Sequence, residues 1–108
     1  MVNEERVLSM LGLAERAGSI QSGGFLTEEA IRSRRAALVI VACDAQKNTL
    51  KMTQDKCAYY HVPLVQFATG RALGHCIGKE QRACLAVTDA GFAKRIQELL
   101  EFTGASEQ

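Results

Sequence analysis

Two short stretches of this chain contain only apolar residues, and they restrict the possible folds more than any other feature of the sequence. The stretches are residues 37–42 and 83–87. A half-exposed strand alternates apolar and polar residues, whereas a strand without alternation normally lies in a sheet that is covered on both faces. Residues 37–42 are therefore predicted to form a central strand between two layers of helices, and residues 83–87 a second apolar strand.

The rest of the chain alternates between helical and extended patterns. Residues 4–17 carry apolar side chains at helical spacing, and Gly18 follows where a C-terminal cap belongs. Thr69 and Asp89 are expected to cap later helices. The other predicted elements are an extended piece at 19–22, helices at 25–34, 46–60, 70–77 and from 90 onward, and a strand at 64–67. This order predicts an α/β fold, a three-layer α-β-α sandwich around a small mixed sheet.

Length and composition indicate one small domain. The chain has 108 residues, of which 47% are hydrophobic, enough for a single core. We expect the domain to span residues 1–102 and a short tail to follow at 103–108. No apolar run approaches the roughly 20 residues that span a bilayer. The polar, acidic N-terminus is unlike a signal peptide, so we predict a cytoplasmic protein with no membrane partner.

Charge is distributed unevenly along the chain. The net charge is +1, but residues 32–95 carry eleven Lys and Arg against four Asp and Glu, while both ends are acidic. Such segregation permits a basic face and hence a polyanionic partner. By itself it does not distinguish a basic face from charges that scatter over the folded surface.

The sequence contains none of the common catalytic motifs. It has no G-x-S-x-G elbow, no G-x-x-x-x-G-K-[ST] phosphate loop and no H-E-x-x-H. Cys43, beside Asp44, is the best candidate nucleophile, but no histidine lies nearby in sequence to act as its base. His75 is interpreted as a packed core residue, and the four cysteines as small buried hydrophobes. We therefore predict a non-enzymatic protein with no metal, cofactor or small-molecule substrate.

Three loops form the candidate binding site. They are residues 23–24 before the second helix, residues 44–45 after the first apolar strand, and residues 78–82 before the second apolar strand. A helix N-terminus presents unpaired N–H groups that attract phosphate, and Lys79 and Arg82 add positive charge. The alternative is that the glycines in these loops are only turn residues with positive φ.

A series of short motifs follows in a fixed order along the chain. They are Leu11-Gly12-Leu13-Ala14-x-Arg16-Ala17-Gly18, Ser22-Gly23, Ala30-Ile31-Arg32, Asp44-Ala45-x-x-Asn48-Thr49, Asp55-Lys56-Cys57, Val62-Pro63, Leu73-Gly74-x-x-Ile77-Gly78-Lys79 and Ala86-Val87-Thr88-Asp89-x-Gly91-Phe92-Ala93. With these motifs in register over residues 7 to about 100, the chain resembles the bacterial YlxQ-like branch of the ribosomal proteins that bind kink-turn RNA.

The resemblance implies a fold, a partner and a site. The fold would be a three-layer sandwich around a four-stranded mixed sheet, and the partner a structured RNA, ribosomal or otherwise kink-turn-like. The family's RNA site is built from the same three loops. In that family an Asn-Glu-x-x-Lys motif on the second helix reads the sheared G·A pairs of the kink-turn. Here Phe25, Leu26 and Glu29 occupy those positions, so the side chains of the motif are not retained.

Six residues are predicted to contact RNA on these grounds. Gly23 and Gly24 are expected to supply backbone N–H donors and close approach, and Lys79 and Arg82 to neutralise phosphate. Phe25 is expected either to stack on a base or to join the core. The six residues are Gly23, Gly24, Phe25, Asp44, Lys79 and Arg82.

Other roles and functions are left open by the sequence. Asp44 either accepts a hydrogen bond from a guanine edge or caps the third helix. Arg32, Arg34 and Arg35 are interpreted as a solvated helix terminus. With no heptads and no large apolar stripe, we expect a monomer. The rival to RNA binding is a protein-interaction module that keeps the fold but has lost kink-turn recognition.

Overall fold

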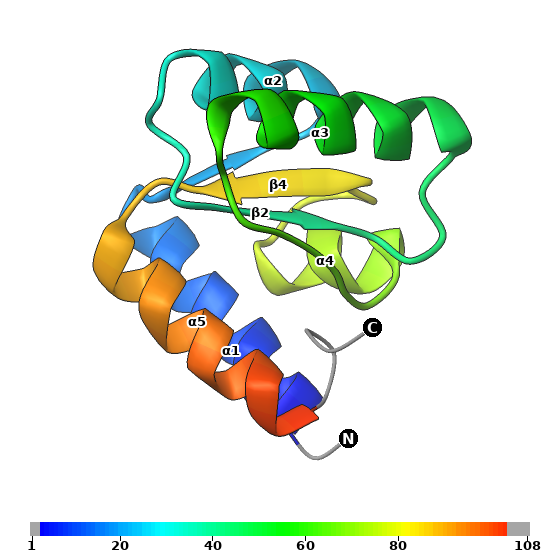
Figure 1. Ribbon diagram of the computed structural model, residues 1–108. Coiled ribbons are helices and arrows are strands. Elements are labelled where there is room, and N and C mark those ends of the chain that lie inside the picture. The colour runs from blue at the N-terminus through cyan, green and yellow to red at the C-terminus, as the bar shows by residue number, and fades with distance from the viewer. Residues whose placement is uncertain (1–2, 104–108) are drawn as a thin grey trace.

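The computed structural model describes residues 3–103, in which helices and strands alternate in the predicted order (Figure 1). The elements are α1 (Asn3–Arg16), β1 (Ile20–Ser22), α2 (Gly24–Arg32), β2 (Leu38–Val41), α3 (Lys47–Tyr60), β3 (Leu64–Gln66), α4 (Gly70–Cys76), β4 (Cys84–Val87) and α5 (Ala90–Thr103). The predicted tail lies outside the described residues except for Thr103, which ends α5. Within the described part, no helix has the length and apolar character needed to cross a bilayer.

The strands form one four-stranded mixed sheet in the order β1-β4-β2-β3. β4 runs antiparallel to both β1 and β2, whereas β2 and β3 are parallel. The two apolar stretches are thus the two central strands, and every residue of both strands is buried. A strand with apolar side chains on both faces fits this position, because either face is covered by helices.

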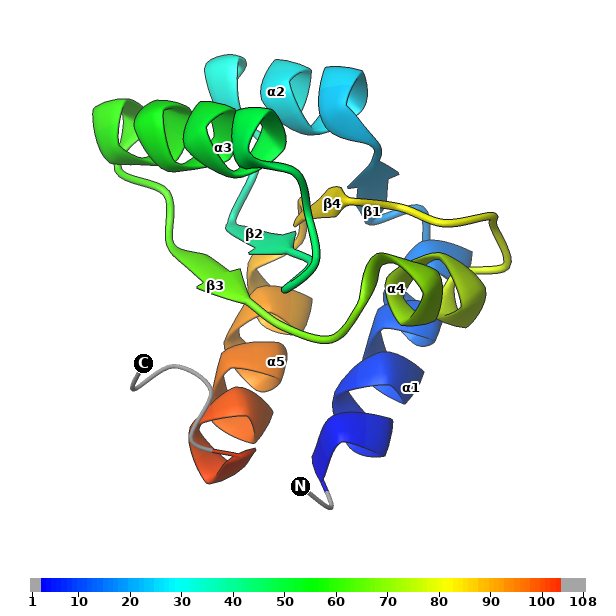
Figure 2. The same ribbon diagram turned by 90° about the vertical axis from the view of Figure 1, so that its right-hand side faces the viewer.

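The helices cover the sheet in two layers. α2 and α3 lie on one face, and α1, α4 and α5 on the other (Figures 1 and 2). Alternate side chains of each central strand enter opposite cores. Leu38 and Ile40 pack in the core beneath α1, α4 and α5, while Val39 and Val41 pack beneath α2 and α3. This arrangement confirms the predicted three-layer α-β-α sandwich.

Local signals in the sequence set the ends of several helices. Gly18 adopts a φ of 77° just after α1, a backbone conformation that favours glycine. The Thr69 hydroxyl oxygen accepts a hydrogen bond from the Ala72 N–H at 3.1 Å, and Asp89 Oδ2 accepts one from the Phe92 N–H at 2.8 Å. The predicted caps of α4 and α5 are therefore present, because each satisfies an N–H that has no partner within the helix.

Two glycines let a loop lie directly on α4. Gly70 and Gly74 are four residues apart, so both lie on the same side of the helix. The Lys79 N–H donates to the Gly74 carbonyl at 2.8 Å, and the Arg82 N–H donates to the Gly70 carbonyl at 3.0 Å. A Cβ atom on Gly74 would overlap the carbonyl oxygen of Glu80. The path of residues 78–83 therefore depends on this helix side having no side chains.

Substitution of Gly74 tests this packing. Gly74→Ala should lower the free energy of unfolding by about 1–3 kcal/mol, because the loop must move away from α4 to admit the methyl group. Gly24→Ala is the matched control, since a Cβ placed there meets no atom within 4 Å beyond its chain neighbours and the adjacent backbone of α2, and it should stay within about 0.5 kcal/mol of wild type. Urea unfolding followed by circular dichroism measures both. Equal effects of the two substitutions would contradict the close packing.

Candidate functional site

The three loops chosen from the sequence meet at one end of the sheet. β1 and β2 end there and β4 begins there, because Ser22 pairs with Leu85 and Val41 pairs with Cys84. The Gly23 N–H donates to the Cys84 carbonyl at 2.9 Å. Figure 2 shows the molecule from this end. We call this surface the loop end; it comprises residues 22–26, 42–47, 68–71 and 78–83.

A fourth loop, between β3 and α4, joins the other three. The Cys43 N–H donates to the Ala68 carbonyl at 2.8 Å, and the Gly70 N–H donates to Asp44 Oδ1 at 2.9 Å. Asp44 therefore does not cap α3, which begins after Gln46 without a side-chain cap. Its carboxylate sits instead at the N-terminus of α4, where the peptide dipoles favour negative charge. This contact was not predictable from local sequence patterns, because the two residues lie 26 positions apart.

Arg82 links the loop before β4 to the end of β1. Its Nε donates to Ser22 Oγ at 3.2 Å, and its Nη1 donates to the carbonyls of Glu80 and Gln81 at 3.4 and 3.1 Å. The half-buried guanidinium is thus held at the junction of two predicted loops. Lys79 lies farther toward α1, with its Nζ 3.7 Å from Glu15 Oε2. Both predicted cations border the loop end, but the charge of Lys79 is shared with an acid.

The two glycines before α2 differ in their roles. Gly23 has a φ of 93° and its N–H is bonded to Cys84, so it is a turn residue and not the free donor that was predicted. Gly24 has no positive φ and open space around its Cα. The first hydrogen bond within α2 runs from the Thr27 N–H to the Gly23 carbonyl at 2.9 Å. The N–H groups of residues 24–26 therefore precede the helical ladder and have no partner within it.

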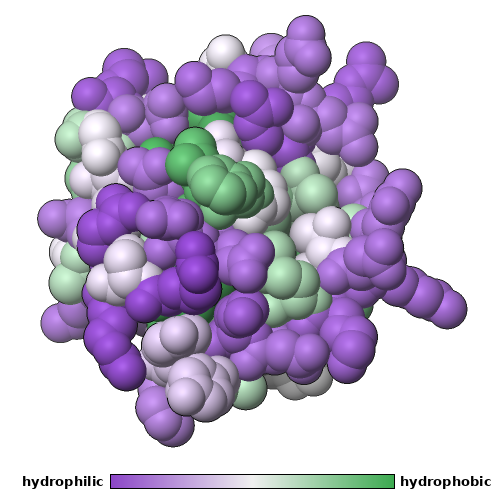
Figure 3. Space-filling model, turned by 90° about the horizontal axis from the view of Figure 1, so that it is seen from above, coloured by the Kyte–Doolittle hydropathy of each residue, from purple (hydrophilic) through white to green (hydrophobic). Residues whose placement is uncertain are grey.

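Phe25 is exposed and does not join the core. The residue is 76% exposed, and its neighbour Leu26 is 43% exposed. Figure 3 views the face formed by α2 and α3, on which hydrophobic side chains gather within largely hydrophilic surroundings. Two adjacent apolar side chains at the start of a helix contribute little to folding when they remain in water. Their exposure leaves them available to a partner.

Two cations at the loop end were not among the predicted site residues. Lys47 begins α3 and Arg71 lies in the first turn of α4, and both are exposed. A helix dipole disfavours positive charge at its N-terminus, so these positions do not stabilise the helices that carry them. Their place near the predicted site could have been read from the sequence, since Lys47 closely follows Asp44 and Arg71 closely follows the helix cap Thr69.

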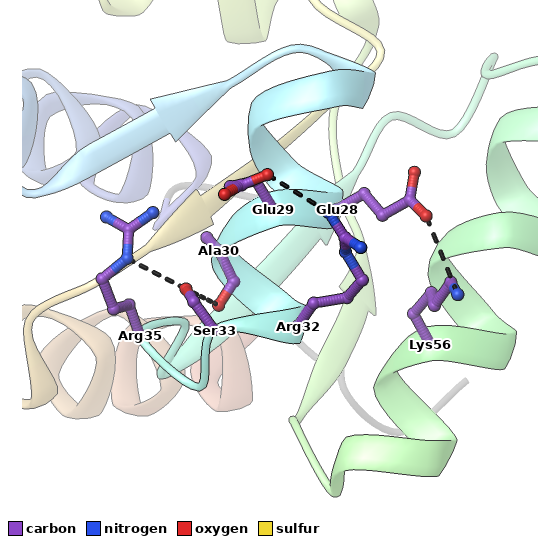
Figure 4. A network of polar contacts seen from close by, with 7 residues as sticks. All are labelled: Glu28, Glu29, Ala30, Arg32, Ser33, Arg35 and Lys56. Carbon is purple, nitrogen blue, oxygen red and sulfur yellow. Dashed lines mark hydrogen bonds and ion pairs between the residues drawn. The ribbon is translucent and has the colours of Figure 1, made fainter.

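The acids of α2 are paired with bases (Figure 4). Glu29 Oε1 lies 3.2 Å from Arg32 Nη2 on the same helix, and Glu28 Oε2 lies 3.7 Å from Lys56 Nζ on α3. Exposed ion pairs of this kind contribute at most about 1 kcal/mol to stability. They do reduce the negative potential that Glu29 brings to the position where the kink-turn family has a lysine.

Cys43 and His75 are exposed, which corrects two predictions. Cys43 follows β2 on the surface, and His75 lies on the open side of α4 and not in the core. Cys57 and Cys84 are buried as predicted, and Cys76 is half-buried. Burial raises the pKa of Cys57 and of Cys76 to about 11. Within residues 3–103, no three His, Cys, Asp or Glu side chains are grouped as metal ligands.

Thiol labelling distinguishes these environments. At pH 8 a maleimide should label Cys43 first, because the thiol is exposed. Cys57 and Cys76 should react slowly, since a pKa of about 11 leaves about one thiol in a thousand ionised at that pH. Mass spectrometry of the folded and urea-unfolded protein measures the rates. Labelling of Cys57 as fast as Cys43 in the folded protein would contradict the burial. Fast labelling of Cys43 follows from exposure alone and is no sign of catalysis.

Comparison with known proteins places the chain in a family. Residues 5–97 match the Ribosomal protein L7Ae/L30e/S12e/Gadd45 family. The chain belongs to this family. It is 47% identical over 92 residues to the RNA-binding protein YlxQ of Bacillus subtilis (strain 168), covering 85% of this chain and 92% of that protein. It is 38% identical over 99 residues to the RNA-binding protein YlxQ of Enterococcus faecium, covering 92% and 95%.

These matches confirm the resemblance to YlxQ-like proteins. Both relatives are named RNA-binding proteins and neither name describes an enzyme, in agreement with the prediction of a non-enzymatic protein. Among solved structures, a Bacillus halodurans C protein of unknown function has a TM-score of 0.84 at 36% identity, over 88% of this chain and 96% of that one. The Giardia lamblia 15.5kD RNA binding protein, at 17% identity, shares the fold with a TM-score of 0.79, over 98% and 91% of the two chains.

Proposed function

We propose that this member of the L7Ae family binds structured RNA through the loop end, as a cytoplasmic monomer, and that its target is a ribosomal or other kink-turn-like RNA. The observation that carries the proposal is the convergence of four hydrogen-bonded loops beside Arg82, Lys47 and Arg71. The names of the YlxQ relatives support the same partner. Binding sites on loops that a rigid scaffold positions are common in proteins.

Each part of the loop end has a role in this proposal. The N–H groups of residues 24–26 bind phosphate at the start of α2, and Gly24 lets the RNA backbone approach closely. Arg82 and Lys79 neutralise phosphates beside it, and Gly23 contributes its turn instead of an N–H. Phe25 stacks on an unpaired base. The Oδ1 of Asp44 accepts a hydrogen bond from the Gly70 N–H and so holds the two loops together. Its Oδ2 can accept a second hydrogen bond from the edge of a base.

Kink-turn recognition would proceed without the family's side-chain motif. Phe25, Leu26 and Glu29 replace Asn, Glu and Lys, so the backbone and the neighbouring loops would carry more of the binding free energy. The decisive experiment is titration of a labelled kink-turn RNA at two salt concentrations, alongside the same RNA with its G·A pairs replaced. Tight binding that is lost on replacement supports the proposal. Equal binding to both RNAs contradicts kink-turn specificity but not RNA binding, and no binding to either contradicts both.

Gly24→Val tests the approach of the RNA backbone. The substitution should weaken RNA binding by roughly tenfold, because a branched side chain fills the space beside the first N–H groups of α2. It should leave the free energy of unfolding within about 0.5 kcal/mol of wild type, since the new Cβ meets no atom within 4 Å beyond its chain neighbours and the adjacent backbone of α2. Gly24→Ala is the graded control and should cause a smaller loss. Unchanged affinity of the valine variant would remove Gly24 from the site.

Glu29→Lys tests the departure from the family motif. Replacing an acid with a base beside the phosphates should raise RNA affinity by roughly tenfold at low salt and steepen the salt dependence. Glu98→Lys on α5 is the control, because Glu98 also pairs with an arginine three residues away, at 3.4 Å, but lies far from the loop end. An equal gain in both variants would mean that the added charge acts non-specifically.

The alternative function is a protein-interaction module on the same fold. Exposed Phe25 and Leu26, where RNA-reading polar side chains stand in the family, favour it. A binding interface is commonly centred on an aromatic or aliphatic side chain that a pocket of the partner encloses. This alternative predicts that Phe25→Ala abolishes pull-down of a protein partner while RNA titrations show no binding. RNA binding with a steep salt dependence would contradict it.

A further inference from the structure

A second basic and aromatic surface lies at the opposite end of α2 from the loop end. The chain turns away from α2 through Ser33, Arg34 and Arg35, and α3 ends beside it (Figure 1). From the sequence alone these arginines are interpreted as a solvated helix terminus. In the structure Arg34 stands next to Tyr60 of α3, whose ring contacts that of Tyr59, and Arg35 follows Arg34 in the chain. We call this surface the Arg–Tyr surface; it comprises Arg34, Arg35, Tyr59 and Tyr60.

Arg34 occupies a backbone position that normally favours glycine. Its φ is 63°. The Arg34 N–H donates to the Ile31 carbonyl at 3.1 Å and the Arg35 N–H to the Ala30 carbonyl at 3.0 Å, which is the Schellman pattern that ends helices. For a residue with a side chain this left-handed conformation is unfavourable, because the Cβ atom crowds the backbone. Folding alone would therefore be served better by glycine at this position.

The side chain of Arg34 connects the two helices. Its guanidinium carbon lies 5.2 Å from the centre of the Tyr60 ring, within the range of a cation–π contact. The Tyr60 ring meets the Tyr59 ring edge to face, with centres 4.8 Å apart and planes at 78°. Tyr59 is 75% exposed. The exposed Tyr59 ring is thus separated from the Arg34 cation by the Tyr60 ring, which contacts both.

The two arginines of this surface are not neutralised. Arg32 pairs with Glu29 and Lys56 pairs with Glu28, as Figure 4 shows. The Nε of Arg35 donates only to the Ser33 hydroxyl oxygen, at 2.9 Å. Among the described residues, neither Arg34 nor Arg35 forms an ion pair with a carboxylate. Both side chains are exposed and free to meet an anion.

We propose that the Arg–Tyr surface binds an unpaired segment of RNA, with a base stacked on Tyr59 and phosphates paired with Arg34 and Arg35. An exposed ring beside uncompensated arginines matches the combination that single-stranded nucleic acids require, a stacking face and phosphate partners. The nine residues of α2 span about 13 Å, so one RNA can reach both ends of the helix. The proposal extends the proposed function, adding a contact outside the loop end.

The experiment uses Arg34→Gly, which separates binding from folding. Glycine relieves the positive φ and removes the cation, so this variant should unfold at the same or a higher urea concentration than wild type. Three RNAs are titrated: the kink-turn alone, the kink-turn with an unpaired uridine extension, and free oligouridine. In wild type the extension should raise affinity roughly tenfold. In Arg34→Gly and Tyr59→Ala this gain should vanish, while affinity for the kink-turn alone stays unchanged.

Tyr59→Phe is the matched control, because it keeps the ring and should keep the gain. An extension that adds nothing in wild type, or a gain that survives in both Arg34→Gly and Tyr59→Ala, overturns the proposal. Free oligouridine makes the test independent of the loop end. If the kink-turn does not bind at all, weak oligouridine binding that is lost in the two variants still supports the Arg–Tyr surface, and equal oligouridine binding by all variants overturns it.

Discussion

The close contact between α4 and the loop before β4 is the constraint on which the loop end depends. Gly70 and Gly74 leave one side of α4 bare, so the backbone of residues 78–83 lies on it and bonds to their carbonyls. That path brings Arg82 to Ser22 at the end of β1. The same helix start is tied to the loop after β2 through Asp44. A change in this one contact would therefore be transmitted to every loop at this end of the sheet.

The central strands give these loops a rigid support. β2 and β4 are buried along their whole length and pair with each other, and β1 and β3 flank them. Loops anchored at the ends of such strands keep their positions while their side chains remain in water. Lys47 and Arg71 at helix N-termini, and exposed Phe25, contribute little to stability there. These residue choices are better explained by a partner at the loop end than by folding.

Much of this fold was predictable from local sequence signals. The unbroken apolar runs identified the strands at 37–42 and 83–87, the first of them as central, and Gly18, Thr69 and Asp89 marked helix ends, because each signal acts over a few residues. Contacts between residues far apart in sequence were not predictable. They are the hydrogen bond from the Gly70 N–H to Asp44, the hydrogen bond from the Gly23 N–H to the Cys84 carbonyl of β4, and the position of the loop between β3 and α4. The exposure of Cys43 and His75 was also misread, because apolar neighbours in sequence do not determine which side of an element faces the core.

Three residues with an unfavourable backbone conformation lie at the two proposed binding surfaces or at the end of a neighbouring helix. Arg34, His61 and Ala68 have positive φ without being glycine. Ala68 lies in the loop end, where its carbonyl accepts the Cys43 N–H. Arg34 and His61 follow the ends of α2 and α3.

A residue other than glycine persists in the left-handed conformation when its surroundings fix it firmly or when its side chain is needed. For Ala68 the first reason applies, because its side chain is a single methyl group and its carbonyl is bonded. For Arg34 the second applies, because glycine would complete the same helix-ending bonds without strain and only the guanidinium would be lost.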